Sequence, residues 1–203
     1  MNSFDERAKD WDDNPNRRNL ALATASAIRE KLIQKPGMAA LEYGCGTGML
    51  GFALHENFAS ITLADSSQGM LDVLSEKIKA AGLPHMKPIR LDLSSDPLPS
   101  KRYDVILSQM ALHHIPDTST IISKLHALLK PGGELFLADL DEEDGSFHGP
   151  DADVHKGFNR DALKAMLERT GFKNVSFSTV FQVRRPVGDA ERDFPVFLAS
   201  AGK

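Results

Sequence analysis

The turn Glu42–Gly48, with the sequence E-Y-G-C-G-T-G, has the residue types and spacing of a ligand-binding loop. A short apolar run, 38–41, precedes it, and a helical pattern over 49–58 follows. A strand, a glycine turn and a helix in this order open the nucleotide-binding units of α/β sheets. Glycines let a backbone approach a ligand closely, because they carry no side chain and tolerate positive φ. The sequence therefore predicts a nucleotide-like ligand over this turn.

Two ligands fit the turn at this level. Residues 46–51 also match G-x-G-x-x-G, and Asp65 follows at the distance of a ribose-binding carboxylate, which would indicate a dinucleotide. Glu42 argues against that, because a carboxylate 4 Å from a pyrophosphate is repelled by about 4 kcal/mol at an effective dielectric of about 20. It favours a ligand with an ammonium group and no phosphate. S-adenosylmethionine (SAM), with its adenosine, sulfonium and amino-acid tail, is such a ligand.

In the wider pattern E-x-G-x-G-x-G, the chain resembles class I SAM-dependent methyltransferases over most of its length. The resemblance implies SAM as cofactor and S-adenosylhomocysteine as product, with Glu42 near the methionine ammonium. The turn residues Gly44, Cys45, Gly46 and Gly48 would lie under the methionine portion. The segment 108–117, S-Q-M-A-L-H-H-I-P-D, is similar to small-molecule enzymes, including quinone-biosynthesis methyltransferases, and not to the Asn/Asp-Pro-Pro-aromatic type.

The composition is that of an ordinary globular protein. Of 203 residues, 41% are hydrophobic and 26% charged, and the net charge is −4 with a pI near 6.0. Such a balance provides no basic field for nucleic acid or anionic membranes. The acidic start, 1–13, is unlike a signal peptide, and Cys45 has no second cysteine to pair with. We expect a cytoplasmic protein with no nucleic-acid or membrane partner; its oligomeric state stays open.

Strand-like and helix-like segments alternate along the chain, which predicts one domain, with an N-terminal helical segment over 1–34 and a core over 35–203. The expected strands are 38–43, 60–64, 87–91, 103–108 and 134–140, and the expected helices are 49–58, 68–81, 117–129 and 159–171. This order is typical of a doubly wound, mostly parallel α/β sheet with helices on both faces.

The C-terminal part predicts two further strands, 173–183 and 194–201. The loop between them, with Pro186 and Gly188, is too short for a crossover helix, so the two strands should pair as an antiparallel hairpin. Seven strands ending in such a hairpin are similar to the methyltransferase sheet. A dinucleotide enzyme would need further sequence for a substrate domain.

Ligands of such sheets lie at the carboxyl ends of the strands. Asp65 ends the second expected strand, where its carboxylate could accept hydrogen bonds from both ribose hydroxyls or merely cap the next helix. Ser66 and Met70 follow it. Met70 could pack on the adenine or be an ordinary core residue.

Two more strand ends supply candidates. By the resemblance, Asp92 would accept from the adenine amine, and the backbone of Leu93 would contact a ring nitrogen. Asp92 could instead only form a turn before two serines. Gln109 would line the cofactor pocket at the end of the next strand.

Histidines are candidates for proton transfer, because free imidazole titrates near neutrality. His113 and His114 follow the fourth parallel strand, and His148 lies in the loop after the next one. Histidines in such places also serve structural roles. We select His113 and His148 as candidate catalytic bases and expect no metal site, because the spacing matches no metal motif.

The segment 139–155 is rich in Asp and Glu and contains no Lys or Arg. It could be a solvated loop, or it could select a cationic small-molecule acceptor such as an amine. In the second case, neutralising Asp139, Asp141 and Asp151 together would weaken acceptor binding and leave cofactor affinity nearly unchanged.

Phe4 and Trp11 could form a lid over the cofactor, or Trp11 could simply anchor the first helix. A sulfonium methyl is already activated, so a base is needed only where the nucleophile must lose a proton. The sequence therefore does not fix O-, N-, S- or C-methylation. A nicotinamide-dependent oxidoreductase and a non-catalytic SAM-binding protein stay open as alternatives.

Overall fold

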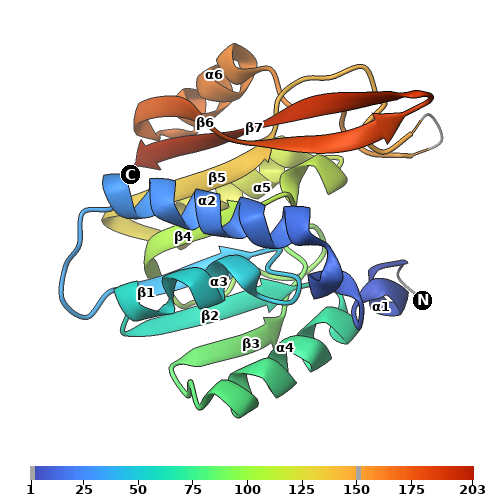
Figure 1. The fold of residues 1–203 in the computed structure, drawn as a ribbon. Coiled ribbons are helices and arrows are strands. Elements are labelled where there is room, and N and C mark those ends of the chain that lie inside the picture. The colour runs from blue at the N-terminus through green and yellow to red at the C-terminus, as the bar shows by residue number, and fades with distance from the viewer. Residues whose placement is uncertain (1–2, 150–151) are drawn as a thin grey trace.

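The computed structural model describes residues 3–149 and 152–203, and its centre is a twisted seven-stranded sheet (Figure 1). The strands run in the spatial order β3-β2-β1-β4-β5-β7-β6, and β7 is antiparallel to both of its neighbours. Their bounds are β1 Ala39–Tyr43, β2 Ser60–Asp65, β3 Met86–Arg90, β4 Tyr103–Gln109, β5 Leu129–Leu140, β6 Lys173–Val187 and β7 Ala190–Gly202. The predicted mostly parallel sheet with a C-terminal hairpin is confirmed.

Helices cover both faces of this sheet (Figure 1). The described helices are α1 Ser3–Arg7, η1 Trp11–Asp13, α2 Pro15–Lys31, α3 Met49–Leu54, η2 His55–Asn57, α4 Gln68–Ala81, η3 Leu112–His114, α5 Thr118–Leu128 and α6 Arg160–Thr170. Apolar residues of α2, α3 and α4 pack in the core on one face, and those of α5 and α6 pack in the core on the other.

The strand sequences explain why both faces are covered. Val105 and Leu107 of β4 belong to the core under α2 to α4, whereas Ile106 belongs to the core under α5 and α6. Successive strand side chains point to opposite faces, so a strand buried on both sides needs a continuous apolar run. This burial holds the carboxyl ends of the parallel strands in a fixed arrangement.

The N-terminal region differs from the expected helical segment over 1–34. It is broken into α1, η1 and α2, and α2 begins at Pro15 with Asn14 as its cap. The side chain of Asn14 accepts a hydrogen bond from the Asn16 N–H at 2.9 Å. Proline disfavours a helical conformation in the residue before it, which separates α2 from the preceding turn. Residues 1–2 lie outside the described chain.

The C-terminal half departs from the predicted bounds in two places. Strand β5 begins at Leu129, before the Pro131–Gly133 segment that was expected to precede it, because Leu129 pairs with Tyr103 across a bulge. The hairpin is longer than predicted, and its turn is only Gly188 and Asp189. Pro186 is tolerated within β6 because β6 lies at the edge of the sheet. The first four strands agree with the predicted ranges to within one residue.

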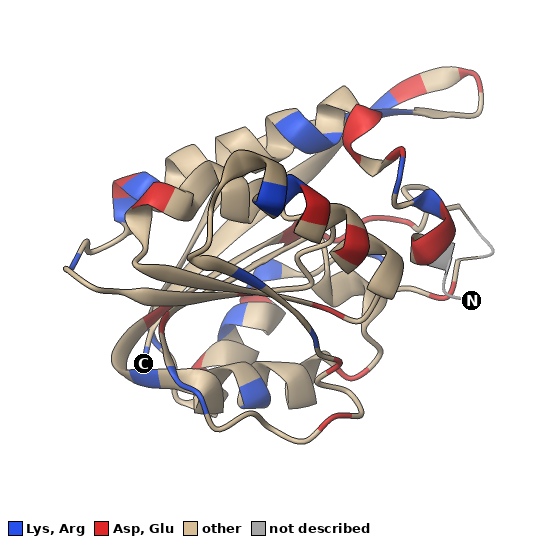
Figure 2. Cartoon of the chain, turned by 90° about the horizontal axis from the view of Figure 1, so that it is seen from below, with Lys and Arg blue, Asp and Glu red and all other residues tan. Residues whose placement is uncertain are grey.

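The chain order reverses between β1 and β4, which places a topological switch point beside the carboxyl end of β1. Basic and acidic positions are interspersed along the helices and loops in view (Figure 2). No helix in the described ranges combines the length and apolar character required to span a membrane.

Candidate functional site

A cavity of about 940 Å³ lies at this switch point, under the N-terminal segment. Its volume suits a cofactor-sized ligand together with a small second molecule. Most of the residues predicted to bind the cofactor line its wall: Glu42, Gly44, Cys45, Gly46, Asp65, Ser66, Met70, Asp92 and Gln109. Both candidate bases, His113 and His148, line the same cavity.

Glycines shape the turn at the cavity floor. Gly44 has a φ of +71°, and a Cβ on it would lie 2.3 Å from the Cβ of Ala111. Gly48 has a φ of +79° at the start of α3, where a Cβ would lie 2.6 Å from Leu74 of α4. A side chain at either position would combine backbone strain with a steric clash. Gly44 therefore allows the segment after β4 to approach the turn, and Gly48 allows α3 and α4 to pack together beside it.

Two residues of the cavity wall each carry a buried acceptor atom with no hydrogen-bond partner among the described residues. The atoms are Oε2 of Glu42, which lies close to Gly51 of α3, and Oε1 of Gln109. Burial, aided by the nearby charge of Asp65, raises the pKa of Glu42 to about 8. A buried polar atom without a partner is costly, and a cationic ligand group would relieve that cost. This wall fits the ammonium end of SAM.

The thiol of Cys45 is buried in the turn, and this burial raises its pKa well above the ordinary value. Nucleophilic cysteines need a lowered pKa, because the thiolate is the reactive form. The environment of Cys45 therefore suits a small residue in a crowded turn.

Asp65 connects the glycine turn to the next strand. Its carboxylate accepts hydrogen bonds from the Gly46 N–H at 2.7 Å and the Ser67 N–H at 2.9 Å. The cap of α4 is Ser67 itself, whose hydroxyl accepts from the Met70 N–H at 3.2 Å. Each Asp65 oxygen can accept further hydrogen bonds, and the residue lines the cavity. Its role toward ribose hydroxyls stays a prediction.

Two predicted cofactor residues, Gly48 and Leu93, do not line this cavity. Gly48 acts through packing against α4. Leu93 is buried, and its N–H donates to the hydroxyl of Tyr43 at 3.3 Å. Its predicted contact with an adenine ring nitrogen would compete with that bond. Asp92 lines the cavity, and it also accepts from the Ser94 N–H at 2.8 Å, the turn-forming contact that the sequence left open.

The N-terminal segment forms part of the cavity wall. Phe4 and Trp11 line it with their rings 5.7 Å apart, and the Trp11 indole nitrogen lies over Gly46. Asp5 accepts from the Ser67 hydroxyl at 2.6 Å and from the Gly69 N–H at 3.0 Å. The segment is thereby tied to the start of α4.

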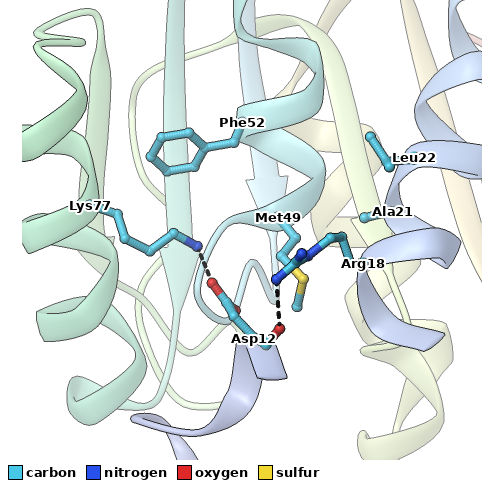
Figure 3. Close-up of a pocket in the computed structure, with 7 residues that line it drawn as sticks. All are labelled: Asp12, Arg18, Ala21, Leu22, Met49, Phe52 and Lys77. Carbon is cyan, nitrogen blue, oxygen red and sulfur yellow. Dashed lines mark hydrogen bonds and ion pairs between the residues drawn. The ribbon is translucent and has the colours of Figure 1, made fainter. Parts of the chain in front are cut away.

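A second tie fixes η1. The carboxylate of Asp12 pairs with Lys77 of α4 at 2.5 Å and accepts from the Thr47 hydroxyl at 2.5 Å. Figure 3 shows Asp12 between Lys77 and Arg18, whose guanidinium donates to the Asp12 carbonyl at 3.4 Å. Asp5 and Asp12 thus hold the lid residues predicted from the sequence, and neither was identified in advance.

The histidines form one cluster over η3. Asp139 is buried at the end of β5, and one of its oxygens lies 2.5 Å from Nδ1 of His113. The other oxygen accepts from the N–H groups of Leu112 and His113. Nε2 of His113 lies 3.0 Å from Nε2 of His148. Since Asp139 accepts a hydrogen bond from Nδ1, it holds His113 in the tautomer that carries its proton on Nδ1. Nε2 of His113 is then an acceptor that faces His148.

Burial and the neighbouring imidazoles lower the pKa of His114 to about 3 and that of His148 to about 4. Both rings are therefore neutral near pH 7. The ligand atoms of His113, His114 and His148 all lie within 4.8 Å of one another. Such a group can move a proton, and neutral imidazoles can also bind a divalent metal. The absence of a metal stays a prediction.

Carboxylates of the acid-rich segment mostly have partners inside the protein. Asp139 holds His113, Asp141 forms a two-point ion pair with Arg160 at 2.6 Å, and Asp144 pairs with Arg192 at 2.6 Å. Asp153 is the one described Asp or Glu of this segment on the cavity wall. Asp151, which we expected to contribute to cation selection, lies outside the described residues.

Several residues on the cavity wall were not identified from the sequence. Arg7, Arg17 and Arg185 line it from α1, α2 and β6. Tyr43 and Phe147 are also on the wall. No local pattern marks the three arginines, because they come together only once the N-terminal segment and the hairpin are folded.

The fold is shared with solved methyltransferase structures. The crystal structure of a SAM-dependent methyltransferase from Aquifex aeolicus aligns with a TM-score of 0.68 over 98% of this chain and 97% of that one, at 20% identity. Sheet order, glycine turn and cavity together define the class of fold, the Rossmann-like fold that this chain shares with solved SAM-dependent methyltransferases.

Residues 13–177 match the model of a methyltransferase domain family, and the chain belongs to that family. An uncharacterized methyltransferase of Schizosaccharomyces pombe is 35% identical over 161 residues, covering 71% of this chain and 55% of that protein. A ubiquinone biosynthesis O-methyltransferase of Coxiella burnetii is 31% identical over 139 residues, covering 66% of this chain and 58% of that protein. The chain thus spans little more than half the length of these curated relatives.

Proposed function

We propose that the protein transfers a methyl group from SAM to a small-molecule acceptor. The observation that carries the proposal is the buried carboxylate of Glu42, which lines the cavity beside the glycine turn with one oxygen unpartnered. An amino-acid ammonium would favour the ionised form of this carboxyl and supply it with a donor and an opposite charge, whereas a phosphate would favour the neutral form and gain no such partner. This preference distinguishes SAM from nicotinamide cofactors.

Each of the predicted wall residues binds a different part of the cofactor. Glu42 accepts from the ammonium, Asp65 from the ribose hydroxyls and Asp92 from the adenine amine, with Met70 packing near the base. The Leu93 backbone takes part only where its bond to Tyr43 is given up. When bound, SAM supplies a methyl group already activated by its sulfonium.

The remaining work of the protein is alignment and proton handling. The lid residues Phe4 and Trp11 exclude water, and the cavity wall holds the acceptor nucleophile in line with the methyl group, an effect that can contribute roughly 7–11 kcal/mol. For an acceptor that must lose a proton, His148 accepts it at Nδ1 while its Nε2 proton moves to Nε2 of His113. Asp139 stabilises the positive charge that results on His113.

Calorimetric titration with S-adenosylhomocysteine, run beside NADH, tests the cofactor. We expect binding of S-adenosylhomocysteine alone, and a loss of at least about 100-fold in Asp65→Ala, because hydrogen bonds to a charged group contribute about 1.5–3 kcal/mol each. Asp72→Asn, an exposed carboxylate change on α4, is the matched control. Binding of NADH alone would reverse the proposal.

Turnover separates an enzyme from a non-catalytic SAM-binding protein. The acceptor screen covers amines, phenols, thiols and carbon nucleophiles. Methyl transfer is measured as the release of S-adenosylhomocysteine. Activity that Asp65→Ala abolishes supports the enzyme. Tight cofactor binding with no turnover in any class favours a non-catalytic SAM-binding protein. Of the acid-rich segment from which a cationic acceptor was expected, Asp153 is the one described carboxylate on the cavity wall.

A further inference from the structure

Three guanidinium groups line the cavity and stack on aromatic rings of its wall. Arg7 and Arg17 lie over the ring of Trp11, at 5.2 and 3.7 Å from its centre, and Arg185 lies 4.6 Å from the ring centre of Phe147. All three arginines line the cavity wall. An aromatic face holds a guanidinium in place and leaves its N–H groups available at the edges.

No ion pair among the described residues includes Arg7, Arg17 or Arg185. Arg17 and Arg185 instead donate to main-chain carbonyls, those of Trp11 at 2.9 Å and Phe147 at 2.5 Å. Burial and the charges of the two other arginines lower the pKa of Arg17, and the charge of Asp12 only partly offsets them. Like charges gathered in this way repel one another until an anion is bound.

The other arginines of the hairpin provide a contrast. Arg184 and Arg192 each pair with a carboxylate, at 2.8 and 2.6 Å. Arg184 is the chain neighbour of Arg185 on β6, and it is paired with Asp193 across the hairpin. Arg185 is therefore the arginine of the hairpin that lines the cavity and has no ion pair.

The arginine cluster adjoins the histidine cluster. The ring of His148 lies 4.8 Å from that of Phe147, which in turn carries Arg185. The charges of Arg185 and Arg7 both disfavour a proton on His148. A group bound by these arginines would lie beside the imidazole that we place at the reacting nucleophile.

The carboxylates on the cavity wall lie mainly in the cofactor half. Glu42, Asp65 and Asp92 come from the ends of β1 and β2 and from the segment after β3. Asp153 is the remaining described carboxylate on the wall, opposed by three arginines. The balance of charge around the acceptor space is therefore positive.

We propose that Arg7, Arg17 and Arg185 bind an oxyanion group, carboxylate or phosphate, on the methyl acceptor. The inference rests on the proposed function in so far as it assigns the bound oxyanion to a methyl acceptor. The anion site itself does not require SAM. Guanidiniums bind both oxyanions through two parallel N–H donors, which would orient the acceptor as well as select it.

The only tryptophan in the sequence provides a direct reporter, because Arg17 lies against its ring. Trp11 fluorescence is recorded at constant ionic strength while the protein is titrated with benzoate, phenyl phosphate, benzylamine or benzyl alcohol. These probes share one ring and differ in charge. Each titration is made with and without saturating S-adenosylhomocysteine.

We expect the two anions to bind at least tenfold more tightly than the amine and the alcohol, and their order to show whether the site prefers carboxylate or phosphate. Arg185→Gln should weaken anion binding about tenfold or more, and Arg185→Lys, which retains the charge but not the fork, should weaken it less. Arg184→Gln, on the same strand, should leave it unchanged.

Tighter binding of benzylamine than of both anions would overturn the proposal and restore the cationic acceptor. Equal losses in Arg184→Gln and Arg185→Gln would overturn it as well, because the effect would then be one of general charge. Anion binding without any binding of S-adenosylhomocysteine would leave the oxyanion site standing and remove the proposed methyl transfer.

Discussion

The two halves of the cavity are built in different ways. The cofactor half consists of strand ends that follow one another in the first half of the chain. Glu42 lies on β1 at the switch point, Asp65 ends β2 and Asp92 follows β3, the outermost of the three strands. The acceptor half is assembled from α1, α2, η3, the loop after β5 and the hairpin. In the cofactor half, the fold itself fixes the arrangement, because each residue lies at or just after the end of a parallel strand. In the acceptor half, the chemistry can change through loops and terminal segments without a change of fold.

The histidine relay provides the sharpest test of this division, because it should affect chemistry and leave cofactor binding intact. With an acceptor found by turnover, we expect His148→Gln to lower kcat about 10²-fold or more, since a general base contributes about 10²–10⁴. Asp139→Asn should act in the same direction by releasing the tautomer of His113. The affinity for S-adenosylhomocysteine, measured by calorimetry, should stay within about twofold of wild type.

The control is His155→Gln, because His155 bonds to the carbonyls of Ile115 and Pro116 and lies off the cavity wall. In the wild type, kcat should be flat near neutral pH and fall below about pH 5, since protonation of an imidazole whose pKa is about 4 removes the base. An unchanged kcat in His148→Gln would assign the cluster a structural or metal-binding role, and metal analysis of the purified protein would separate these two.

The same division explains what the sequence could predict. The strands β1, β2 and β4 were placed to within one residue, because a strand buried on both faces is a largely apolar run ended by turn residues. Nine predicted cofactor residues line the cavity because they lie at strand ends, which the sheet topology brings to one edge. Leu93 failed to reach the wall because a tertiary contact, the hydroxyl of Tyr43, occupies its N–H.

The acceptor half could not be predicted in this way. The acid-rich segment suggested a cationic acceptor, but the charge of Asp141 is neutralised by Arg160, and Asp139 is turned toward His113. Each partner is distant in sequence, so the count of local charges carried no information on the field in the cavity. Arg17 and Arg185 illustrate the same point, because only the packing of α2 near the hairpin brings them together.

The cofactor half can be tested through the pKa of Glu42, which is raised to about 8 in the protein alone. A bound ammonium favours the ionised carboxylate, so binding should release a proton from Glu42. Affinity should then rise with pH below the free pKa, by about tenfold between about pH 6 and about pH 7.5, where the ligand amine is still charged. Calorimetry with S-adenosylhomocysteine in buffers of different ionisation enthalpy measures both the slope and the proton. Glu42→Gln should remove the slope, and a slope that persists in this variant would assign the proton to another group.

The lid connects the two halves, and we expect its release to have the smallest effect. Asp5 and Asp12 attach the N-terminal segment to α4 and to the glycine turn through hydrogen bonds and one partly exposed ion pair. Such contacts contribute about 0.5–1.5 kcal/mol per hydrogen bond and less than about 1 kcal/mol for the ion pair. The double variant Asp5→Ala/Asp12→Ala should therefore weaken the binding of S-adenosylhomocysteine about five- to tenfold. We expect most of this loss in a faster dissociation rate, which can be measured through Trp11 fluorescence.

Asp13→Ala provides the control for the lid, because Asp13 is an exposed carboxylate in the same short helix, η1. An equal effect in this variant would mean that net charge, not attachment, governs release. Because the segment also carries Phe4, Trp11 and Arg7, the double variant should weaken benzoate together with the cofactor, whereas Glu42→Gln should weaken the cofactor alone. Loss of the cofactor with full retention of benzoate binding would show that the lid serves one half of the cavity and that the arginine cluster forms without it.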